Sequence, residues 1–161
     1  MAEVLVAEPQ PEPERPVVVL IAEDEDVVRA TVARVLWGEG YRTLEAHDGA
    51  EALHLAHLTW PHLHLVITDV MMPTVDGLEL GRRLAVACPA LPVLYMSGYC
   101  RGDIFNRDGP GADAPFLRKP FNNEDLLAKV RDLLDATKHT SGLDFTCPQL
   151  LPDLQMRDEQ R

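Results

Sequence analysis

Five polar side chains of this sequence each follow an apolar, strand-like run of residues. The runs are residues 17–22, 65–68, 93–96 and 116–118, and the side chains that follow them are Glu23, Asp24, Asp69, Ser97 and Lys119. In a parallel sheet the carboxyl ends of all strands lie at one edge, and open α/β sheets bind their ligands in the crevice outside that edge. We therefore expect these five side chains to lie close together.

Strand-like and helix-like segments alternate along most of the chain. The unbroken apolar run at residues 17–22 is typical of a strand that is buried on both faces. The predicted strands are residues 17–22, 41–46, 63–68, 92–96 and 114–117, and the predicted helices are residues 26–37, 48–60, 76–87 and 122–136. Residues 99–113 are rich in glycine and leave room for one weak helix at most. This alternation predicts a doubly wound α/β fold with a parallel sheet and about five helices.

Three of the predicted helices begin with a capping signal. Asp48 and Asp76 each precede a glutamate by three positions, and Asn122 precedes Asp125 by the same spacing. In this arrangement the first side chain accepts a hydrogen bond from a free backbone N–H group of the first helical turn. The starts of these helices are therefore better defined by the sequence than their ends.

The chain divides into three regions by composition. Residues 1–15 alternate proline with glutamate and glutamine, which favours an extended, disordered leader. Residues 16–136 carry the alternating pattern and predict one domain. Residues 137–161 lose the periodicity and predict a polar C-terminal tail that is too short for a second domain.

The overall composition excludes several classes of function. The net charge is -11, with 15 Lys and Arg against 26 Asp and Glu, and this argues against a direct nucleic-acid surface, which needs clustered basic side chains. No apolar run reaches the ~18 residues that a membrane span needs, and the N-terminus lacks the pattern of a signal peptide. Three cysteines make no closed disulfide framework, so we expect a cytoplasmic protein.

The predicted cluster suits a divalent cation and a phosphoryl group. Glu23, Asp24 and Asp69 offer hard oxygen ligands of the kind that Mg²⁺ prefers. Asp69 stands alone at its strand end and is our candidate nucleophile, which would form an acyl phosphate. Lys119 can neutralise charge on that group and Ser97 can donate a hydrogen bond to it, which is most of what phosphoryl transfer requires.

Four segments of the sequence resemble the receiver domain (CheY-like) of two-component response regulators. They are Val-Leu-Ile-Ala-Glu-Asp-Glu at 19–25, Ile-Thr-Asp-Val-Met-Met-Pro-Thr-Val-Asp-Gly at 67–77, Tyr-Met-Ser-Gly-Tyr at 95–99 and Leu-Arg-Lys-Pro-Phe at 117–121. The resemblance covers about residues 17–136. It implies a flavodoxin-like sheet with strand order 2-1-3-4-5, and the third and fourth segments are also similar to receivers of hybrid sensor histidine kinases.

The resemblance also implies a role for each site residue. Asp69 would accept phosphate from a histidine kinase or phosphotransfer protein, with Mg²⁺ bound by Glu23, Asp24, Asp69 and the backbone carbonyl of Met71. Ser97 matches the switch hydroxyl of the family and Phe116 its switch aromatic residue, while Lys119 precedes a cis peptide to Pro120. Phosphorylation would draw Ser97 toward the phosphoryl group and let Phe116 turn inward, which changes a surface for a downstream protein or for a phosphorylation-dependent homodimer.

The sequence departs from the family at several positions. Many members have aspartate at the position of Glu23, and Phe116 lacks a hydroxyl, so an inward rotamer would be stabilised by packing alone. The glycines of residues 99–113 are unusual for the fourth helix of the family. Met71 and Tyr99 flank the expected entry of water, and we expect them to slow loss of the phosphate.

Three other functions are alternatives to a single-domain response regulator. An Mg²⁺-dependent aspartyl phosphatase of the haloacid-dehalogenase type would place a second aspartate at the position of Met71, which this chain lacks. An inert, receiver-shaped scaffold would have lost one of the site residues, and all are present. A zinc site is disfavoured because no cysteine or carboxylate lies at a zinc-ligand spacing from the histidines. We expect the histidines to be solvated surface residues. We therefore expect a phosphoacceptor signalling domain and not an enzyme with turnover.

Overall fold

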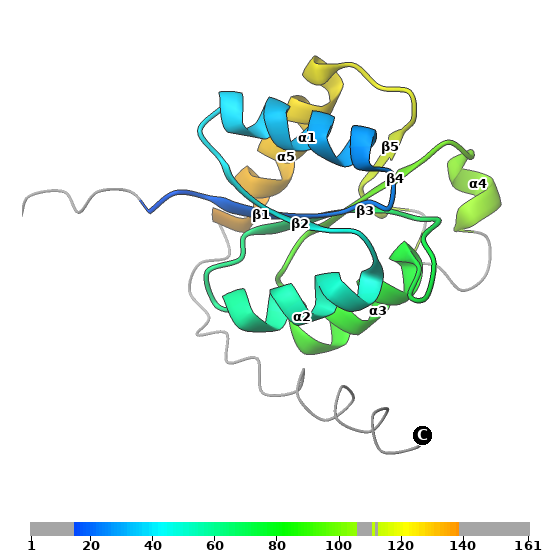
Figure 1. Cartoon of the computed structure of the whole chain (residues 1–161), viewed down its shortest axis with the longest axis horizontal. Helices are drawn as coiled ribbons and strands as arrows, with labels where there is room; N and C mark the ends of the chain where they lie inside the picture. Colours follow the sequence, from blue (N-terminus) through cyan, green and yellow to red (C-terminus); the bar gives the residue numbers. More distant parts are fainter. Residues whose placement is uncertain (1–14, 106–110, 112, 139–161) are drawn as a thin grey trace, which may run out of the picture.

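A five-stranded parallel sheet with helices on both faces forms the protein in the computed structural model, which describes residues 15–105, 111 and 113–138 (Figure 1). The strands are β1 Val18–Ala22, β2 Arg42–Ala46, β3 Leu65–Asp69, β4 Val93–Ser97 and β5 Phe116–Arg118. The helices are α1 Asp26–Gly38, α2 Gly49–Thr59, α3 Gly77–Ala87, α4 Arg101–Ile104 and α5 Asn123–Lys138. The strand order is β2-β1-β3-β4-β5 and every pairing is parallel, so the predicted fold is confirmed.

Two apolar layers hold the helices against the sheet. Alternate residues of β1 point to opposite faces, so Leu20 packs with residues of α2 and α3 while Val19 and Ile21 pack with residues of α1 and α5. Figure 1 shows the same division, with α1 and α5 on one side of the sheet and α2 and α3 on the other. The central strand β3 is buried along its whole length; residues 65–67 are apolar, as a strand covered on both faces requires, and the polar Thr68 and Asp69 complete it.

The predicted helix caps are present in the structure. Oδ1 of Asp48 accepts a hydrogen bond from the backbone N–H of Glu51, and Oδ1 of Asp76 accepts one from that of Glu79, each at 2.8 Å. Asn122 caps α5 in the same way through the N–H of Asp125. These caps fix where α2, α3 and α5 begin relative to the strands that precede them.

Strand boundaries differ from the predicted ones by one or two residues. The predicted strand at 63–68 begins at Leu65 instead and includes Asp69. His64, just before it, is bonded twice to Val18: its N–H donates to the Val18 carbonyl oxygen, and its ring Nδ1 accepts from the Val18 N–H, each at 3.0 Å. His64 is therefore half-buried, and the expectation that the histidines are solvated is wrong for this residue. Burial lowers the pKa of His64, and the neighbouring His62 lowers it further.

The segment after β4 contains a short helix, as its glycines predict. Helix α4 has four residues, whereas α3 and α5 have 11 and 16. The remainder of the loop at residues 106–110 and 112, the predicted leader up to residue 14 and the predicted tail from residue 139 lie outside the described residues. Within the described part of the chain, no helix is long and apolar enough to cross a membrane.

Candidate functional site

The residues predicted to converge do so at the carboxyl edge of the sheet. Glu23 and Asp24 follow β1, Asp69 ends β3, Ser97 ends β4 and Lys119 follows β5. Carboxylate oxygens of Glu23, Asp24 and Asp69 lie within 4.8 Å of one another. The parallel topology thus brings together groups that lie up to 96 residues apart in the chain.

Lys119 links two of the three acidic side chains. Its Nζ lies 2.7 Å from Oε2 of Glu23 and 3.2 Å from Oδ1 of Asp69. The backbone N–H of Lys119 donates to the carbonyl oxygen of Ser97 at 2.8 Å, which extends the strand pairing of β4 and β5 to this position. The peptide between Lys119 and Pro120 is cis, as the family resemblance implies.

Glu23 is fully buried and is held by two hydrogen bonds. Oε2 accepts from Lys119, and Oε1 accepts from the backbone N–H of Glu25 at 3.1 Å. Burial raises the pKa of the Glu23 carboxyl above its usual value; the bonds to Lys119 and Glu25 oppose this shift, and the charge of Asp69 adds to it. The Glu23 carboxylate therefore lies within the acidic cluster, in contact with Lys119.

Asp69 is nearly buried, with 7 % of its surface exposed. Desolvation raises the pKa of its carboxyl, the Lys119 ammonium lowers it, and the nearby charge of Asp24 raises it again. For Lys119 itself, burial favours the neutral form, but the combined attraction of Glu23 and Asp69 is stronger and raises the pKa of the ammonium. Lys119 is therefore a fixed positive charge between two carboxylates, each of which is harder to ionise than in water.

The oxygen donors of this cluster fit a hard divalent cation. Three carboxylates with a single nearby ammonium leave a net negative charge, and Asp24 keeps its side chain exposed where solvent and a phosphate oxygen can reach it. Mg²⁺ is bound in proteins by one or two carboxylates together with waters and phosphate oxygens. The role of the Met71 carbonyl remains a prediction; Met71 lies two residues after Asp69, and its side chain is 61 % exposed.

Ser97 and the aromatic residues near it form the second part of the site. The Ser97 side chain is buried, and its Oγ accepts a hydrogen bond from the N–H of Tyr99 at 3.1 Å. Phe116 is half-buried and meets Phe105 edge-to-face, with ring centres 5.7 Å apart. The guanidinium of Arg101 lies 5.6 Å from the centre of the Phe116 ring. The short helix α4 therefore packs against the residue that was predicted to switch.

Two residues that support the site were not singled out from the sequence. Arg29 donates to the backbone carbonyl of Glu23 at 2.8 Å and pairs with Asp26 at 2.6 Å, so it fixes the loop that carries the acidic side chains. A Cβ at Gly77 would lie 2.0 Å from the carbonyl oxygen of Asp69, so only glycine lets α3 begin so close to β3. The Asp-Gly pair at 76–77 indicates a helix start in the sequence. The sequence does not indicate that Gly77 lies against the backbone of Asp69.

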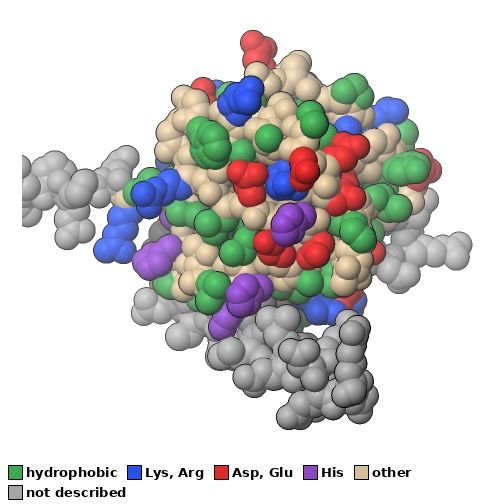
Figure 2. Space-filling model, viewed as in Figure 1, with side chains coloured by type: hydrophobic (Ala, Val, Ile, Leu, Met, Phe, Trp, Pro, Cys, Tyr) green, Lys and Arg blue, Asp and Glu red, His purple; other side chains and the backbone are tan. Residues whose placement is uncertain are grey.

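Acidic side chains continue beyond the buried cluster onto the surface. In Figure 2 they gather on the face that carries α1, β2 and the start of α2, around a basic side chain and a histidine. Arg29 pairs there with Glu45 at 3.4 Å, and His47 pairs with Glu51. The surface next to the site is therefore predominantly negative.

Comparison with known proteins gives one consistent family. The family model described as response regulator receiver domain matches residues 19–131. The sensor kinase CckA of Brucella abortus (strain 2308) is 40% identical over 119 residues, which cover 73% of this chain and 12% of the kinase. The response regulator MprA of Mycolicibacterium vanbaalenii is 37% identical over 144 residues, which cover 88% of this chain and 60% of that protein. The chain thus spans only part of each of these relatives.

Solved structures show the same fold. The receiver domain of the hybrid histidine kinase CckA has a TM-score of 0.62 at 36% identity and is matched over 98% of its length and 73% of this chain. A response regulator receiver protein from Sinorhizobium medicae WSM419 has a TM-score of 0.69 at 25% identity, with 98% of its length and 76% of this chain covered.

Proposed function

Because this chain belongs to the response regulator receiver domain family, we propose that Asp69 accepts a phosphoryl group from a phosphohistidine on a histidine kinase or a phosphotransfer protein. The observation that carries the proposal is the contact of Lys119 with both Glu23 and Asp69, at 2.7 and 3.2 Å. It places a fixed positive charge beside an oxygen nucleophile that burial has partly desolvated. Phosphoryl transfer depends mainly on such positioning and charge stabilisation.

In the transfer step an oxygen of the Asp69 carboxylate forms a bond to phosphorus while the phosphorus–nitrogen bond of the donor breaks. The electron pair of that bond returns to the donor imidazole, so a carboxylate and a phosphohistidine become an aspartyl phosphate and a histidine. Lys119 stays charged throughout, since its raised pKa keeps the ammonium protonated. It can therefore contact the phosphoryl oxygens as charge builds on them.

Glu23, Asp24 and Asp69 are the side chains that would hold Mg²⁺, together with the Met71 carbonyl. When bound, the cation would neutralise the carboxylates and the phosphoryl oxygens that approach them. Glu23 would keep its bond to Lys119 within this set, and the exposed position of Asp24 leaves one side of the cluster open to a donor.

The response to phosphorylation would pass through Ser97 and Phe116. The Ser97 hydroxyl would leave its bond to the Tyr99 N–H and turn to a phosphoryl oxygen. Space next to β4 would then admit the Phe116 ring, which would lose its edge contact with Phe105. Helix α4 contacts the same aromatic rings, so its position would change when Phe116 moves. A downstream protein would recognise that change, and phosphorylation would shift the population between the two positions of α4.

We infer that the chain acts as a cytoplasmic signalling domain that either relays the phosphate or changes a protein-binding surface. Sensor kinases and response regulators are the relatives that support this proposal. Self-phosphorylation and slow loss of the phosphate would be its only chemistry.

Incubation with a small phosphodonor and Mg²⁺ tests the proposal against its alternatives. A switch is expected to gain a hydroxylamine-labile phosphoryl adduct that is absent in Asp69→Asn. An inert scaffold would gain none while its circular dichroism remained that of a folded protein. A phosphatase would release inorganic phosphate continuously from a small phosphoester. Ser97→Ala is expected to slow formation of the adduct, and Ser97→Thr to retain it, because threonine keeps the hydroxyl.

A further inference from the structure

Helix α4 is a single turn, and both of its ends contact the ring of Phe116. The guanidinium of Arg101, the first residue of α4, lies 5.6 Å from the centre of that ring. The ring of Phe105, which follows the last helical residue, meets Phe116 edge-to-face with the ring centres 5.7 Å apart. The N–H of Phe105 donates to the carbonyl oxygen of Arg101 at 3.0 Å and closes the turn. A helix of four residues has little stability of its own, so its position depends on these ring contacts.

The guanidinium of Arg101 lies over two rings that also touch each other. Its distance from the centre of the Phe105 ring is 5.7 Å, close to its distance from Phe116. A cation is attracted to the negative face of an aromatic ring, and the attraction increases when the contact is shielded from water. Arg101 is half-buried, so part of this contact is shielded. The arginine therefore stabilises the present position of the Phe116 ring.

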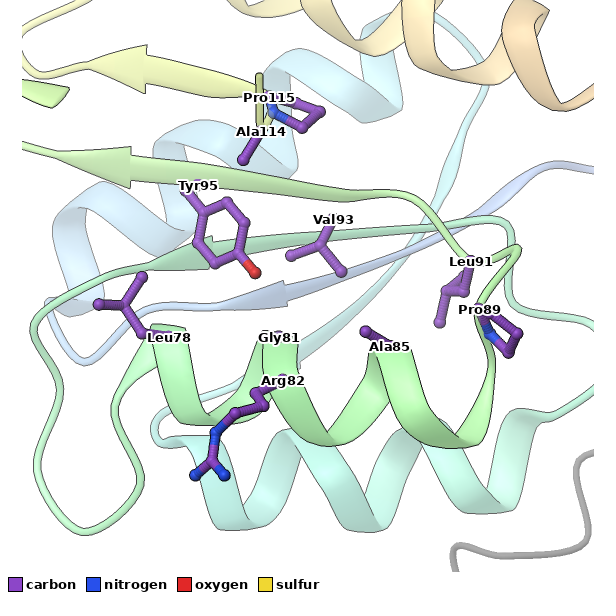
Figure 3. Close-up of a pocket in the computed structure, with 10 residues that line it drawn as sticks. All are labelled: Leu78, Gly81, Arg82, Ala85, Pro89, Leu91, Val93, Tyr95, Ala114 and Pro115. Atoms are coloured by element: carbon purple, nitrogen blue, oxygen red, sulfur yellow. The ribbon is translucent and has the colours of Figure 1, made fainter. Parts of the chain in front are cut away.

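Apolar packing around these rings is less extensive than in the two main layers. Phe105 and Phe116 pack on Tyr95 in the smallest of the three apolar clusters that the described residues form. A groove of about 420 Å³ between α3 and β4 borders the Tyr95 ring on the side away from them (Figure 3). Side chains that border such a space lose dispersion contacts on that side. The contact with Arg101 therefore contributes a larger share of what holds Phe116 than it would in a closely packed core.

We propose that Arg101 is an autoinhibitory clamp, which holds Phe116 in its present outward position and so opposes the change that phosphorylation would cause. The inference rests on the proposed function, because it takes the inward turn of Phe116 from that function. The inward turn would separate the ring from Arg101 as well as from Phe105. Any contact made only in the outward state lowers the population of the inward state. Phosphorylation would have to overcome this contact before α4 could move.

The clamp predicts the direction in which loss of the arginine changes phosphoryl transfer to Asp69. If the inward state is the one that accepts phosphate readily, removing the charge of Arg101 raises the fraction of chains in that state and increases the rate. A purely electrostatic effect has the opposite sign, because losing a positive charge weakens the attraction of an anionic phosphodonor. The sign of the change therefore separates a clamp from a general effect of charge.

Rates of adduct formation in the full chain with acetyl phosphate and Mg²⁺ test the switching role. Arg101→Met removes the charge and keeps a long side chain, and its adduct is expected to form about threefold faster than that of the parent. Arg101→Lys keeps the charge without the planar guanidinium and should give an intermediate rate. Arg118→Met is the matched control, because Arg118 is exposed and follows Phe116 by two positions on β5; its adduct should form no faster than that of the parent.

A double-mutant cycle in urea tests the contact itself and needs no phosphodonor. Arg101→Met and Phe116→Leu are expected to be coupled by at least about twofold in the unfolding equilibrium constant, whereas Arg118→Met and Phe116→Leu should be additive. Equal coupling for the two arginines would overturn the proposal, as would an adduct that forms no faster in Arg101→Met than in the parent. Absence of any adduct in the parent is a different outcome, which would overturn the proposed function and with it the switching role of Arg101.

Discussion

The ammonium nitrogen of Lys119 lies 2.7 Å from Oε2 of Glu23, although 96 residues separate them in the sequence. The Glu23 side chain is 1 % exposed and that of Lys119 is 21 % exposed. Removing one partner of such a pair leaves a buried charge without compensation, which costs more than the pair itself contributes. The stability of the domain and the charge balance of its site therefore depend on the same contact.

Lys119→Gln is expected to destabilise the domain by about 2 kcal/mol at neutral pH. The amide keeps a hydrogen-bond donor but removes the positive charge beside Glu23 and Asp69. Urea denaturation measures the loss. Lys138→Gln is a matched control, because Lys138 pairs at 3.5 Å with Asp135 and both side chains are mostly exposed; its effect should stay within about 0.5 kcal/mol. Equal effects of the two changes would contradict the role given to Lys119.

Asp69→Asn is expected to raise the melting temperature in the absence of Mg²⁺. Burial, opposed by Lys119 and assisted by Asp24, raises the pKa of the Asp69 carboxyl, so the folded state holds this proton more tightly than the unfolded state. The contribution of this group to stability is fully present below its unfolded pKa of ~3.9 and is lost as the pH rises through the folded pKa.

The gain from Asp69→Asn should therefore be clear at pH 7.5 and shrink toward pH 4. Thermal unfolding in EDTA at both pH values measures it, with the exposed Asp132→Asn as control. A variant that is less stable than the parent at pH 7.5, or a difference that does not change with pH, would show that ionised Asp69 does not strain the fold.

Asp24→Asn is expected to weaken Mg²⁺ binding roughly tenfold, which corresponds to ~1.4 kcal/mol. Asp24 is the exposed member of the acidic cluster, so its loss removes an oxygen ligand and leaves the apolar core unchanged. Mg²⁺ should raise the melting temperature of the parent by mass action, and the midpoint of that titration gives the affinity. Glu25→Gln is the neighbouring control, since Glu25 is exposed but outside the cluster, and it should titrate like the parent.

Met71→Asn is expected to shorten the lifetime of the aspartyl phosphate several-fold. Met71 and Tyr99 are each 61 % exposed and follow the strands that end in Asp69 and Ser97. A polar side chain at position 71 can hold an attacking water that the thioether cannot. Decay of the adduct after removal of the donor measures the lifetime, and Leu58→Asn on α2 is an exposed control. Unchanged decay in Met71→Asn would end this explanation.

The convergence of the site was predictable because it depends on few rules. The apolar runs define strands, and parallel pairing places their carboxyl ends at one edge. Knowing this rule is enough to bring Glu23, Asp69 and Lys119 together without knowing any side-chain contact. The helix starts at Asp48 and Asp76 were equally predictable from the sequence, since a cap is a local interaction between residues three positions apart.

Contacts between distant segments could not be predicted from the sequence in the same way. Gly77 and Gly81 are glycines because Asp69 and Tyr95 approach them closely, and a sequence pattern does not reveal which residue lies opposite a glycine. His64 could not be separated from a solvated histidine, because its partner Val18 belongs to another part of the chain. The packing of Ile104 and Phe105 near Tyr95 depends on where α4 ends, which no periodicity encodes.

The most direct test of the account is to locate the modified residue after reaction with a small phosphodonor and Mg²⁺. Borohydride reduces an aspartyl phosphate to homoserine, and peptide mass spectrometry then identifies the position. The account predicts homoserine at position 69 only, dependent on Mg²⁺ and strongly reduced in Lys119→Gln. Homoserine at position 24, or an unmodified chain that remains folded and binds Mg²⁺, would contradict it.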